Sequence, residues 1–428
     1  MKNVVRPETE MKESGASWMG KIPCEWSVSK LKWYLRRVDP RNPGDKQVLS
    51  LYREFGVIPK DSRDDNHNAT SEDTSKYKYV RVGDFVVNKM KAWQGSVAVS
   101  EYDGIVSPAY YVYHFTDDSY HRRYFHYLLR SCYKEEFMRL SGGIRVGQWD
   151  LSSNDLDNVL VVIPKKEEQQ VIADYLDKTC SKIDEIIAEA KVSIDEYKEL
   201  KQSVIDKAVL HGLCNGMMKD SGNDLIGKIP LSWEMRKLKY VADFNPGITT
   251  AYDAQKEVGY VPMNCVKNGY MNPLSARLSD MSTGLTGFQD GDIVIAKVTP
   301  CFENGNIAVA ENLEQGVAFG SSELFVIRTH SINRRFMLYY LQNSVFKNQC
   351  ISTMTGTGGL KRVSGYFVNN AYITYPPENE QQVIVNYLDE AVKNMDFLIA
   401  EKESLINDLE AYKKSLIYEV VTGKRRVV

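Results

Sequence analysis

The chain carries the same short sequences twice, in the same order. Residues 14–26 (SGASWMGKIPCEW) match residues 221–233 (SGNDLIGKIPLSW) at seven of thirteen positions, 207 residues later. Residues 82–89 (VGDFVVNK) correspond to residues 290–297 (DGDIVIAK) at an offset of 208. A period this long indicates a duplicated domain with its appendage rather than a stack of small repeats. The fold is therefore expected to consist of two similar halves.

The second copy of the first stretch contains most of a phosphate-binding loop. Gly222, Gly227 and Lys228 have the required spacing. Ile229 stands where the loop needs a Ser or Thr hydroxyl to hold magnesium. Pro230 follows and restricts its neighbour to extended conformations. The stretch marks the repeat and does not predict a nucleotide site.

Composition places the chain among ordinary globular proteins. Its 428 residues are enough for two to four domains. No apolar run approaches the ~20 residues that a membrane span needs, and the N-terminal sequence lacks the apolar segment of a signal peptide. The seven cysteines form no C-x-x-C pair, which is typical of reduced thiols. We expect a cytoplasmic location and no contact with a membrane.

Two long segments are free of glycine and proline and are predicted to be helices. They cover residues 167–210 and 379–422, and they open on the related sequences EEQQVIADYLD and NEQQVIVNYLD. Prolines precede both segments, and Gly212 and Gly423 follow them as stop signals. The helical segments 166–215 and 378–428 have net charges of −4 and −3, whereas the intervening blocks have +3 and +2. The mildly basic blocks permit phosphate contacts without requiring them.

Apolar residues recur at three-four spacing along both helices, which predicts a coiled-coil seam. About 42 residues at ~1.5 Å each give roughly 60 Å, so the alternative of a helix lying on one domain is disfavoured. The chain order places both helix ends at the second block close together, so the helices are expected to pair antiparallel. The predicted seam consists of Leu176, Ile183, Ile186, Ile194, Leu200, Leu388, Met395, Leu398, Leu405, Leu409 and Leu416.

The two remaining blocks are predicted to be α+β, or mixed, with short β-rich segments separated by Gly, Pro and Asn. Each contains one expected helix, at residues 121–139 and 333–350. The predicted architecture is two similar globular domains separated by two long antiparallel coiled-coil helices, with pseudo-two-fold symmetry. The predicted boundaries are 1–165 and 216–377 for the domains and 166–215 and 378–428 for the helices.

A search for catalytic residues finds no complete set. The sequence Tyr375-Pro376-Pro377-Glu378 resembles part of an amino-methyltransferase motif but lacks its polar residue and its aromatic residue. The glycine-rich run at 355–359 has no preceding apolar strand. The six histidines show no metal-ligand spacing. The sequence predicts neither a catalytic nor a metal site.

The loops of the two blocks read better as DNA contacts. They combine basic, amide and aromatic side chains with glycines, which let the backbone approach phosphates. Arg and Lys match the edge of guanine, and Gln and Asn match adenine. The alternative is that these are ordinary surface loops. The candidate DNA-binding residues are Lys89, Lys91, Trp93, Gln94, Arg145 and Gln148 in the first block and Lys297, Thr299, Asn304, Lys361 and Arg362 in the second.

The order block–helix–block–helix, with its motifs, resembles the specificity subunit of type I restriction-modification enzymes. The motifs are GKIP-x-x-W at the start of each block, GD-x-x-x-x-K within it, TPCFENG in the second block and EQQ-x-I-x-x-YLD at each helix start. The resemblance implies a non-catalytic subunit in which each block is a target-recognition domain for half of a bipartite site in double-stranded DNA. It also implies that the helices act as a spacer and dock two methyltransferase subunits, to which restriction and translocase subunits can be added.

The same resemblance implies that this chain binds no cofactor, and that S-adenosylmethionine, ATP and magnesium belong to the partner subunits. Two other functions stay open on the sequence alone. One is a DNA methyltransferase or nuclease with degenerate motifs, which S-adenosylmethionine binding by the purified chain would favour. The other is a coiled-coil scaffold, which a failure to bind DNA even with partners present would favour.

Overall fold

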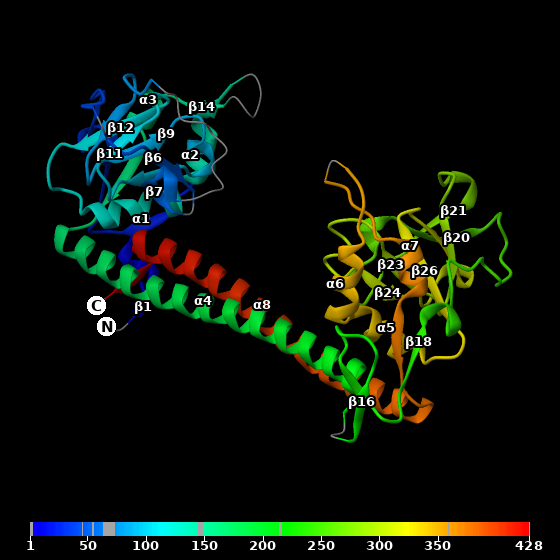
Figure 1. Ribbon diagram of the computed structural model, residues 1–428. Coiled ribbons are helices and arrows are strands. Elements are labelled where there is room, and N and C mark those ends of the chain that lie inside the picture. Colours follow the sequence, from blue (N-terminus) through cyan, green and yellow to red (C-terminus); the bar gives the residue numbers. More distant parts are fainter. Residues whose placement is uncertain are drawn as a thin grey trace. The chain divides into compact units, whose positions relative to one another are not determined.

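The computed structural model describes residues 3–44, 46–53, 55–62, 73–143, 149–213, 216–357 and 359–427. The chain divides into two compact units, shown in Figure 1. Unit 1 comprises Met1–Ala190 and Ser404–Val428, and unit 2 comprises Lys191–Glu403. The division falls inside both long helices, α4 (Lys166–His211) and α8 (Glu378–Val421), so each unit contains part of both.

Unit 1 is built on an antiparallel four-stranded sheet in the order β10-β9-β12-β5. Alternate residues of β9 face opposite sides, as the two-residue period of a strand requires. Phe85 and Val87 join the core that contains Phe125 of α1, whereas Val86 joins a smaller core on the other face. The strands of this unit are β1 (Asn3–Val5), β2 (Met11–Glu13), β3 (Lys21–Pro23), β4 (Ser27–Lys30), β5 (Leu35–Val38), β6 (Leu49–Tyr52), β7 (Gly56–Pro59), β8 (Lys78–Val80), β9 (Phe85–Asn88), β10 (Val97–Val99), β11 (Gly104–Val106), β12 (Tyr110–Phe115), β13 (Ser141–Gly142), β14 (Asp150–Leu151), β15 (Leu160–Ile163) and β28 (Arg425–Val427).

Unit 2 repeats this sheet as β19-β26-β23-β24, also antiparallel. Ile293 and Ile295 of β23 face the core shared with the helices, and Val294 faces a second core. A second four-stranded sheet, β21-β20-β25-β22, contains a parallel pair, β20 with β25. The strands are β16 (Met218–Asp220), β17 (Lys228–Pro230), β18 (Glu234–Lys237), β19 (Ala242–Phe244), β20 (Glu257–Val261), β21 (Leu274–Arg277), β22 (Thr286–Gln289), β23 (Ile293–Ala296), β24 (Ile307–Val309), β25 (Val317–Gly320), β26 (Leu324–Thr329) and β27 (Tyr372–Tyr375).

The prediction of a single helix in each block is wrong, because each block contains two helices at that place. Unit 1 has α1 (Arg122–Cys132) and α2 (Lys134–Leu140), and unit 2 has α5 (Arg334–Gln342) and α6 (Ser344–Ser352). In unit 2 the break is at Asn343, which is extended and whose side chain accepts a hydrogen bond from the Phe346 N–H at 2.8 Å. Asparagine favours such an N-cap over a helix interior. The apolar spacing continues across the break and conceals it.

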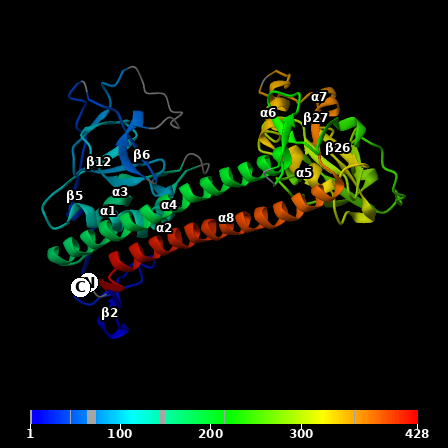
Figure 2. The same ribbon diagram turned by 60° about the horizontal axis from the view of Figure 1, so that its bottom comes forward.

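The repeated tryptophan fixes the ends of the long helices in both units. In unit 1 the Trp26 indole donates to Glu168 near the start of α4 (2.9 Å), and Trp26 also lies against Gly423 after the end of α8. In unit 2 Trp233 donates to Glu380 near the start of α8 (2.6 Å) and lies against Gly212 after the end of α4. The start of one helix therefore adjoins the end of the other in each unit, and their segments run antiparallel within it (Figure 2).

The seam between the helices follows a stricter period than predicted. Leu176, Ile183, Ile194, Leu388 and Leu416 are buried, while Met395 and Leu409 are half-buried. Four predicted seam residues are exposed instead, by 39–50%: Ile186, Leu200, Leu398 and Leu405.

Three of these four errors have one physical cause, whereas the seam position after Leu200 is held by Lys201. Buried positions alternate at spacings of three and four, and each exposed residue lies one position before a seam position. Ile187, Ile399 and Ile406 occupy the seam where the apolar neighbours Ile186, Leu398 and Leu405 were chosen. Where two apolar residues are adjacent, apolar spacing alone does not decide which one faces the partner helix.

Lysines also occupy the seam, and each bonds an aspartate of the other helix. In unit 1 the Lys413 ammonium lies 2.6 Å from Asp184, and in unit 2 Lys201 lies 2.6 Å from Asp396. Each residue of one pair is 212 positions from its counterpart in the other. The aliphatic stems can pack in the seam while the charged ends reach its edge.

A second repeated contact holds each domain on its long helix. Arg123 and Tyr127 of α1 bond Asp177 of α4 at 2.6 and 2.7 Å. Burial opposes the charge of Asp177, but hydrogen bonds from Arg123 and Tyr127 outweigh it and lower the pKa of Asp177.

Within the described residues, the structure contains no helix long and apolar enough to cross a membrane.

Candidate nucleic-acid interface

In unit 1 the loop between β9 and β10 carries four of the candidate residues. Lys89 follows β9 directly, and its ammonium bonds Asp150 at 2.9 Å, which raises the pKa of Lys89. Lys91 is exposed, and its ammonium has no hydrogen bond or ion pair to the described residues. The charge of Lys89 is therefore already compensated by Asp150, whereas Lys91 is available without competition from a carboxylate among the described residues.

The aromatic residue of this loop has a structural role as well. Trp93 lies in the short 3₁₀ helix η4 (Ala92–Gln94), and its indole donates to the Met90 carbonyl at 3.1 Å. The Trp93 ring packs edge-on against Trp149, with ring centroids 5.7 Å apart. Gln94 in the same turn is half-buried. Arg145 and Gln148 lie outside the described residues.

In unit 2 two loops that are distant in sequence are tied together. The Thr299 hydroxyl donates to the Gly359 carbonyl at 2.9 Å and accepts from the Lys361 N–H at 3.0 Å. Lys297 donates to the Ser322 carbonyl at 2.7 Å. The structure therefore places the Thr299 hydroxyl in the loop-to-loop contact, where it orients Lys361.

Two basic residues meet at one carboxylate in this unit. Arg362 forms a two-point contact with Glu323, at 2.9 and 2.6 Å, and Lys297 lies 3.8 Å from the same carboxylate. The hydrogen bond from Arg362 is the main cause that lowers the pKa of Glu323. Lys361 is exposed, and its ammonium has no partner among the described residues. Lys361 is thus an available cation, as Lys91 is in unit 1, but on the other loop: Thr299 stands at the position of Lys91 in the repeat.

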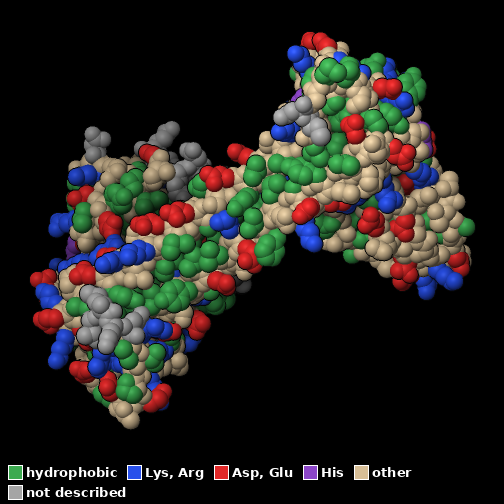
Figure 3. Space-filling view, turned by 90° about the horizontal axis from the view of Figure 1, so that it is seen from below, with side chains coloured by type: hydrophobic (Ala, Val, Ile, Leu, Met, Phe, Trp, Pro, Cys, Tyr) green, Lys and Arg blue, Asp and Glu red, His purple; other side chains and the backbone are tan. Residues whose placement is uncertain are grey.

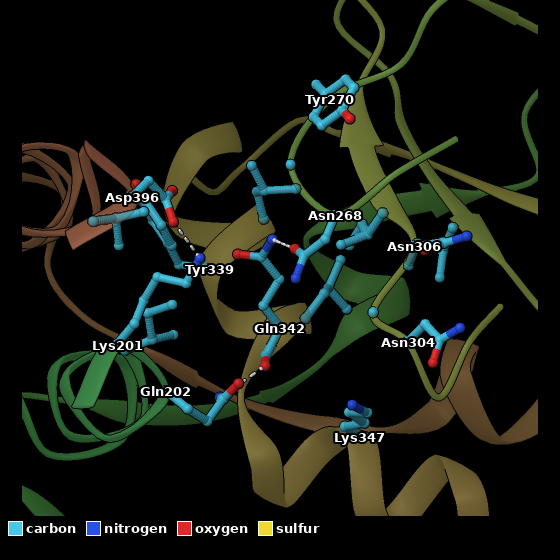
Figure 4. Close-up of a pocket in the computed structure, with 18 of the residues that line it drawn as sticks. Lys201, Gln202, Asn268, Tyr270, Asn304, Asn306, Tyr339, Gln342, Lys347 and Asp396 are labelled. Carbon is cyan, nitrogen blue, oxygen red and sulfur yellow. Dashed lines mark hydrogen bonds and ion pairs between the residues drawn. The ribbon is translucent and has the colours of Figure 1, made fainter. Parts of the chain in front are cut away.

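Asn304 lines a cavity of about 360 Å³ in unit 2. Figure 4 shows Asn304 and Asn306 on one wall and Lys201 with Asp396 on the opposite side. The Gln342 side chain donates to Asn268 at 3.0 Å across the cavity. The Asn304 N–H donates to the Pro300 carbonyl at 2.9 Å, so Asn304 belongs to the same turn as Thr299 but also lines this cavity.

Sequence reasoning missed the acidic partners of these basic residues. Asp150 accepts a hydrogen bond from Lys89, and Glu323 accepts from Arg362. Asp150 follows Trp149 in a loop that the candidate set already includes, but a single carboxylate in a loop carries no distinguishing signal. Asp150 and Glu323 orient the basic side chains that they bond, and they reduce the local positive charge.

Groups that could hold a metal ion are absent from the described part of the chain. Several cysteines there are buried, and burial raises the pKa of Cys132 to about 12 and that of Cys180 to about 11. These thiols are protonated at neutral pH and are poor nucleophiles. The arrangement offers anion-binding and base-edge groups on two similar domains.

Comparison with known proteins decides the family. Residues 42–195 and 230–407 match the family described as type I restriction modification DNA specificity domain. The chain belongs to this family. Its two matched segments each cover most of one domain and the first part of the long helix that follows it, so the family unit occurs twice.

Individual relatives agree with this assignment. The chain is 34% identical over 192 residues to the type I restriction enzyme EcoAI specificity subunit of Escherichia coli, covering 44% of this chain and 32% of that protein. It is 31% identical over 229 residues to the EcoEI specificity subunit, covering 52% and 37%. The chain thus spans about a third of the length of these two relatives. The MjaVIII specificity subunit of Methanocaldococcus jannaschii is 23% identical and aligns over 95% of this chain and 94% of its own length.

Solved structures of specificity subunits share the fold. One such chain comes from a structure that describes complex assembly and conformational transition of the type I R-M system. It has a TM-score of 0.71 at 17% identity, and the match covers 94% of this chain and 99% of that one. The HsdS subunit from Thermoanaerobacter tengcongensis has a TM-score of 0.54, also at 17% identity, covering 94% and 98%. The fold of the specificity domain family is therefore present in both halves of the chain.

Proposed function

We propose that this specificity-domain protein selects the DNA sequence on which a type I restriction-modification complex acts, with each unit reading half of an asymmetric bipartite site. The observation that carries the proposal is that both units bring the same two loops together, and that each unit has an exposed cation on one of them. The Leu151 N–H donates to the Lys89 carbonyl at 2.9 Å in unit 1, and the Val363 N–H donates to the Lys297 carbonyl at 2.9 Å in unit 2. Lys91 in unit 1 and Lys361 in unit 2 both extend from loops held by other polar contacts. Such side chains suit direct reading of a guanine edge or binding of a phosphate.

The basic residues that bond Asp150 and Glu323 add a condition to DNA binding. A base or phosphate that attracts Lys89 or Arg362 competes with an existing ion pair, so only a well-placed acceptor is favourable. The carboxylates therefore penalise poorly matching sequences. In this proposal Lys89, Lys297 and Arg362 contribute to specificity, whereas Lys91 and Lys361 contribute to affinity.

The long helices are proposed to space the two units and to bind methyltransferase subunits. Several of their large hydrophobic side chains lie outside the seam, and Figure 3 shows hydrophobic side chains gathered along the helices. Exposed apolar groups in such number are typical of a protein-binding surface. These exposed residues are Ile186, Val192, Leu200, Val383, Tyr387, Phe397, Leu398, Leu405 and Tyr412.

In this proposal the chain itself catalyses no reaction. Methyl transfer and the binding of S-adenosylmethionine belong to the partner methyltransferase, and ATP and magnesium belong to the restriction subunits. If the purified chain methylated DNA after every partner was removed, this part of the proposal would be refuted.

The division of the site between the units is tested by mapping methylated sequences in cells that express the chain with its cognate methyltransferase. Lys91→Ala is expected to weaken or relax one half-site only, and Lys361→Ala the other half-site only. A control variant, Lys256→Ala, removes an exposed cation that faces Asp253 in unit 2. If Lys91→Ala and Lys361→Ala altered the same half-site, the proposed division would be wrong.

A further inference from the structure

A short turn in each unit presents two lysines and a large aromatic ring. In unit 1 it is the 3₁₀ helix η2 (Leu31–Trp33) with Lys30 before it, and in unit 2 it is η6 (Leu238–Tyr240) with Lys237 before it. The sequences are KLKW and KLKY, 207 residues apart. The central leucine of each turn is fully buried and anchors it. We call these two segments the lysine turns.

The aromatic ring of each lysine turn is exposed to the same extent. Trp33 and Tyr240 are both 65% exposed. The Lys32 ammonium lies 5.6 Å from the centre of the Trp33 ring, and Lys239 lies 5.3 Å from the centre of the Tyr240 ring. A single exposed aromatic residue needs no explanation. An aromatic ring that is equally exposed in both copies, with a lysine beside it in each, indicates a contact that both domains make.

Among the residues that the structure describes, the four lysines of these turns have no acidic partner. Lys30 and Lys32 both donate to the side-chain oxygen of Asn158, each at 3.2 Å. In unit 2 Lys237 lies 5.2 Å from the centre of the Tyr372 ring. Within the described residues, no ion pair joins any of the four lysines to a carboxylate. This distinguishes them from Lys89, whose charge is already compensated.

Because Lys30 and Lys32 bond one oxygen, their ammonium groups are no more than about 6.4 Å apart. Two positive charges at this separation, facing a neutral amide, repel each other until an anion binds between them. An anion with several acceptor oxygens, such as a phosphodiester, can bond both at once. A neutral or basic partner surface would not relieve this repulsion.

Each lysine turn adjoins the element that follows the proposed base-reading loops. In unit 1 the Leu31 N–H donates to Val159 at 2.8 Å, just after the short helix α3 (Ser153–Asp157), which itself follows β14 and Asp150. In unit 2 the Leu238 N–H donates to Ala371 at 2.9 Å, just after α7 (Gly365–Asn370).

The loop that carries Lys361 leads directly into α7, and Gly365 at the start of that helix lies against the Phe325 ring. Lys297 lies 5.5 Å from the centre of the same ring. The short helix therefore links the base-reading loop to the lysine turn in both units, and the strand registers place that loop and that turn at the two ends of the central sheet. Figure 1 labels the short helices α3 and α7 within their respective units.

We propose that the lysine turns bind the DNA backbone beside each half-site, with the lysines on phosphates and the aromatic ring against a sugar. This inference rests on the proposed DNA-recognition function and adds a sequence-independent contact to it. Such contacts set the register of a domain on the duplex and carry no sequence information of their own. Because both turns are alike, each half-site receives the same backbone contact whatever bases its loops read.

The test uses the full complex of this chain with its methyltransferase and a duplex containing the mapped site. The variants are Lys30→Ala with Lys32→Ala, and Lys237→Ala with Lys239→Ala. Each lost phosphate contact reduces the slope of log affinity against log salt by about 0.9, so each double variant is expected to reduce it by about one to two. The methylated sequence should stay the same.

Two further variants serve as controls. Lys178→Ala with Lys182→Ala removes two exposed charges from α4 in unit 1, and it should leave the salt slope unchanged. Trp33→Leu should weaken DNA binding severalfold without changing the slope, because the ring carries no charge. All variants are compared after assembly of the complex is verified by light scattering.

Each outcome bears on the inference. Unchanged salt slopes in both lysine double variants, with the wild-type complex still selecting its site, would overturn it. Loss of the methyltransferase from the complex with unchanged DNA contacts would also overturn it, because the turns would then bind protein. If the wild-type complex showed no sequence preference at all, the proposed function would fail instead.

Discussion

In unit 1 Arg123 and Tyr127 bond Asp177, and in unit 2 Arg335 and Tyr339 bond Asp389 at corresponding positions. The tryptophan–glutamate bonds, the glycines after the long helices and the lysine–aspartate pairs of the seam are repeated in the same way. All of these contacts join a domain to the helices or join the helices to each other. The frame is therefore nearly identical in the two units.

The interiors of the two domains differ. In unit 1 His114 of β12 bonds Asp84 at 2.6 Å, and burial raises the pKa of Asp84. In unit 2 the corresponding strand positions hold Arg328 and Asp292, which form a two-point ion pair at 2.7 and 2.8 Å. Unit 2 also has a complete second sheet, where unit 1 has separate two-stranded pairs.

Two kinds of constraint act on the side chains of the two units. Contacts with the helices must be satisfied in both halves, because each domain is held by the same pair of helices. The domain interior only has to support its own loops, so its polar pairs can change if each buried group keeps a partner. Substitutions at corresponding positions of the two units can test this division.

The largest difference is expected at the glycines after the long helices. Gly423 and Gly212 both have positive φ, at 71° and 76°. A Cβ at Gly423 would overlap the Pro23 ring and approach Trp26 to 2.9 Å, whereas at Gly212 the nearest atom, in Trp233, is 3.1 Å away. Gly423→Ala is expected to cost about 3–4 kcal/mol of unfolding free energy, and Gly212→Ala about 1–2 kcal/mol.

Hydrogen exchange resolved by peptide measures both variants, because it reports on unit 1 and unit 2 separately. Gly222→Ala is a suitable control, since it has a similar φ of 73° and open space around its Cβ position. Equal losses for Gly423→Ala and Gly212→Ala would mean that backbone strain alone decides, and that the closer packing in unit 1 has no effect.

The second prediction concerns the differing polar pairs. Asp292→Asn leaves Arg328 charged and half-buried without its partner, and it is expected to destabilise unit 2 by roughly 3 kcal/mol. Asp84→Asn is expected to destabilise unit 1 by about 1 kcal/mol, because the uncharged amide can still accept the hydrogen bond from the Arg81 N–H. Urea unfolding followed by peptide-level exchange measures both. Asp292→Asn combined with Arg328→Gln should recover part of the loss, and no recovery would contradict the assignment to an unpaired charge.

Acid should also affect the units differently. Burial lowers the pKa of His126 to about 3, with the charges of Arg130 and Arg123 adding to the effect of burial. The folded state therefore binds fewer protons than the unfolded state between pH 6.5 and about 3, so unit 1 loses stability as the pH falls through this range. Between pH 6.5 and 4.5 the loss is expected to be roughly 2 kcal/mol. Unit 2 has the buried Leu338 at the corresponding position.

His126→Leu tests this effect. The variant should remove most of the acid sensitivity that is specific to unit 1, and it should leave unit 2 unchanged. Tryptophan fluorescence is a convenient readout, because five of the six tryptophans lie in unit 1. An unfolding profile in acid that is the same for the variant and the wild type would show that another group controls the acid response.

The repeat made the architecture predictable from the sequence, because GKIP and the YLD motif mark corresponding contacts. The seam was less predictable. Its period was clear, but Ile186 and Ile187 are chemically equivalent, and only the position of the opposite helix decides which is buried. The candidate loops were chosen from their composition and stay a prediction, and the acidic partners of their basic residues were missed. Glu323 is 39 residues from Arg362 in sequence, and only the fold brings them together.

The smallest effect is predicted where the two units are most alike. Lys413 with Asp184 and Lys201 with Asp396 have similar side-chain exposures, of 28% with 58% and of 24% with 52%. Exposed ion pairs of this kind contribute about 0.2–1 kcal/mol, so double-mutant cycles with alanine should give the same coupling energy in both units within a few tenths. The exchange Asp184→Lys with Lys413→Asp should retain stability, because the opposite charges still face each other. If the coupling energies differed by more than about 1 kcal/mol, the seam would be part of what distinguishes the two halves, and the division between a common frame and variable domain interiors would have to be redrawn.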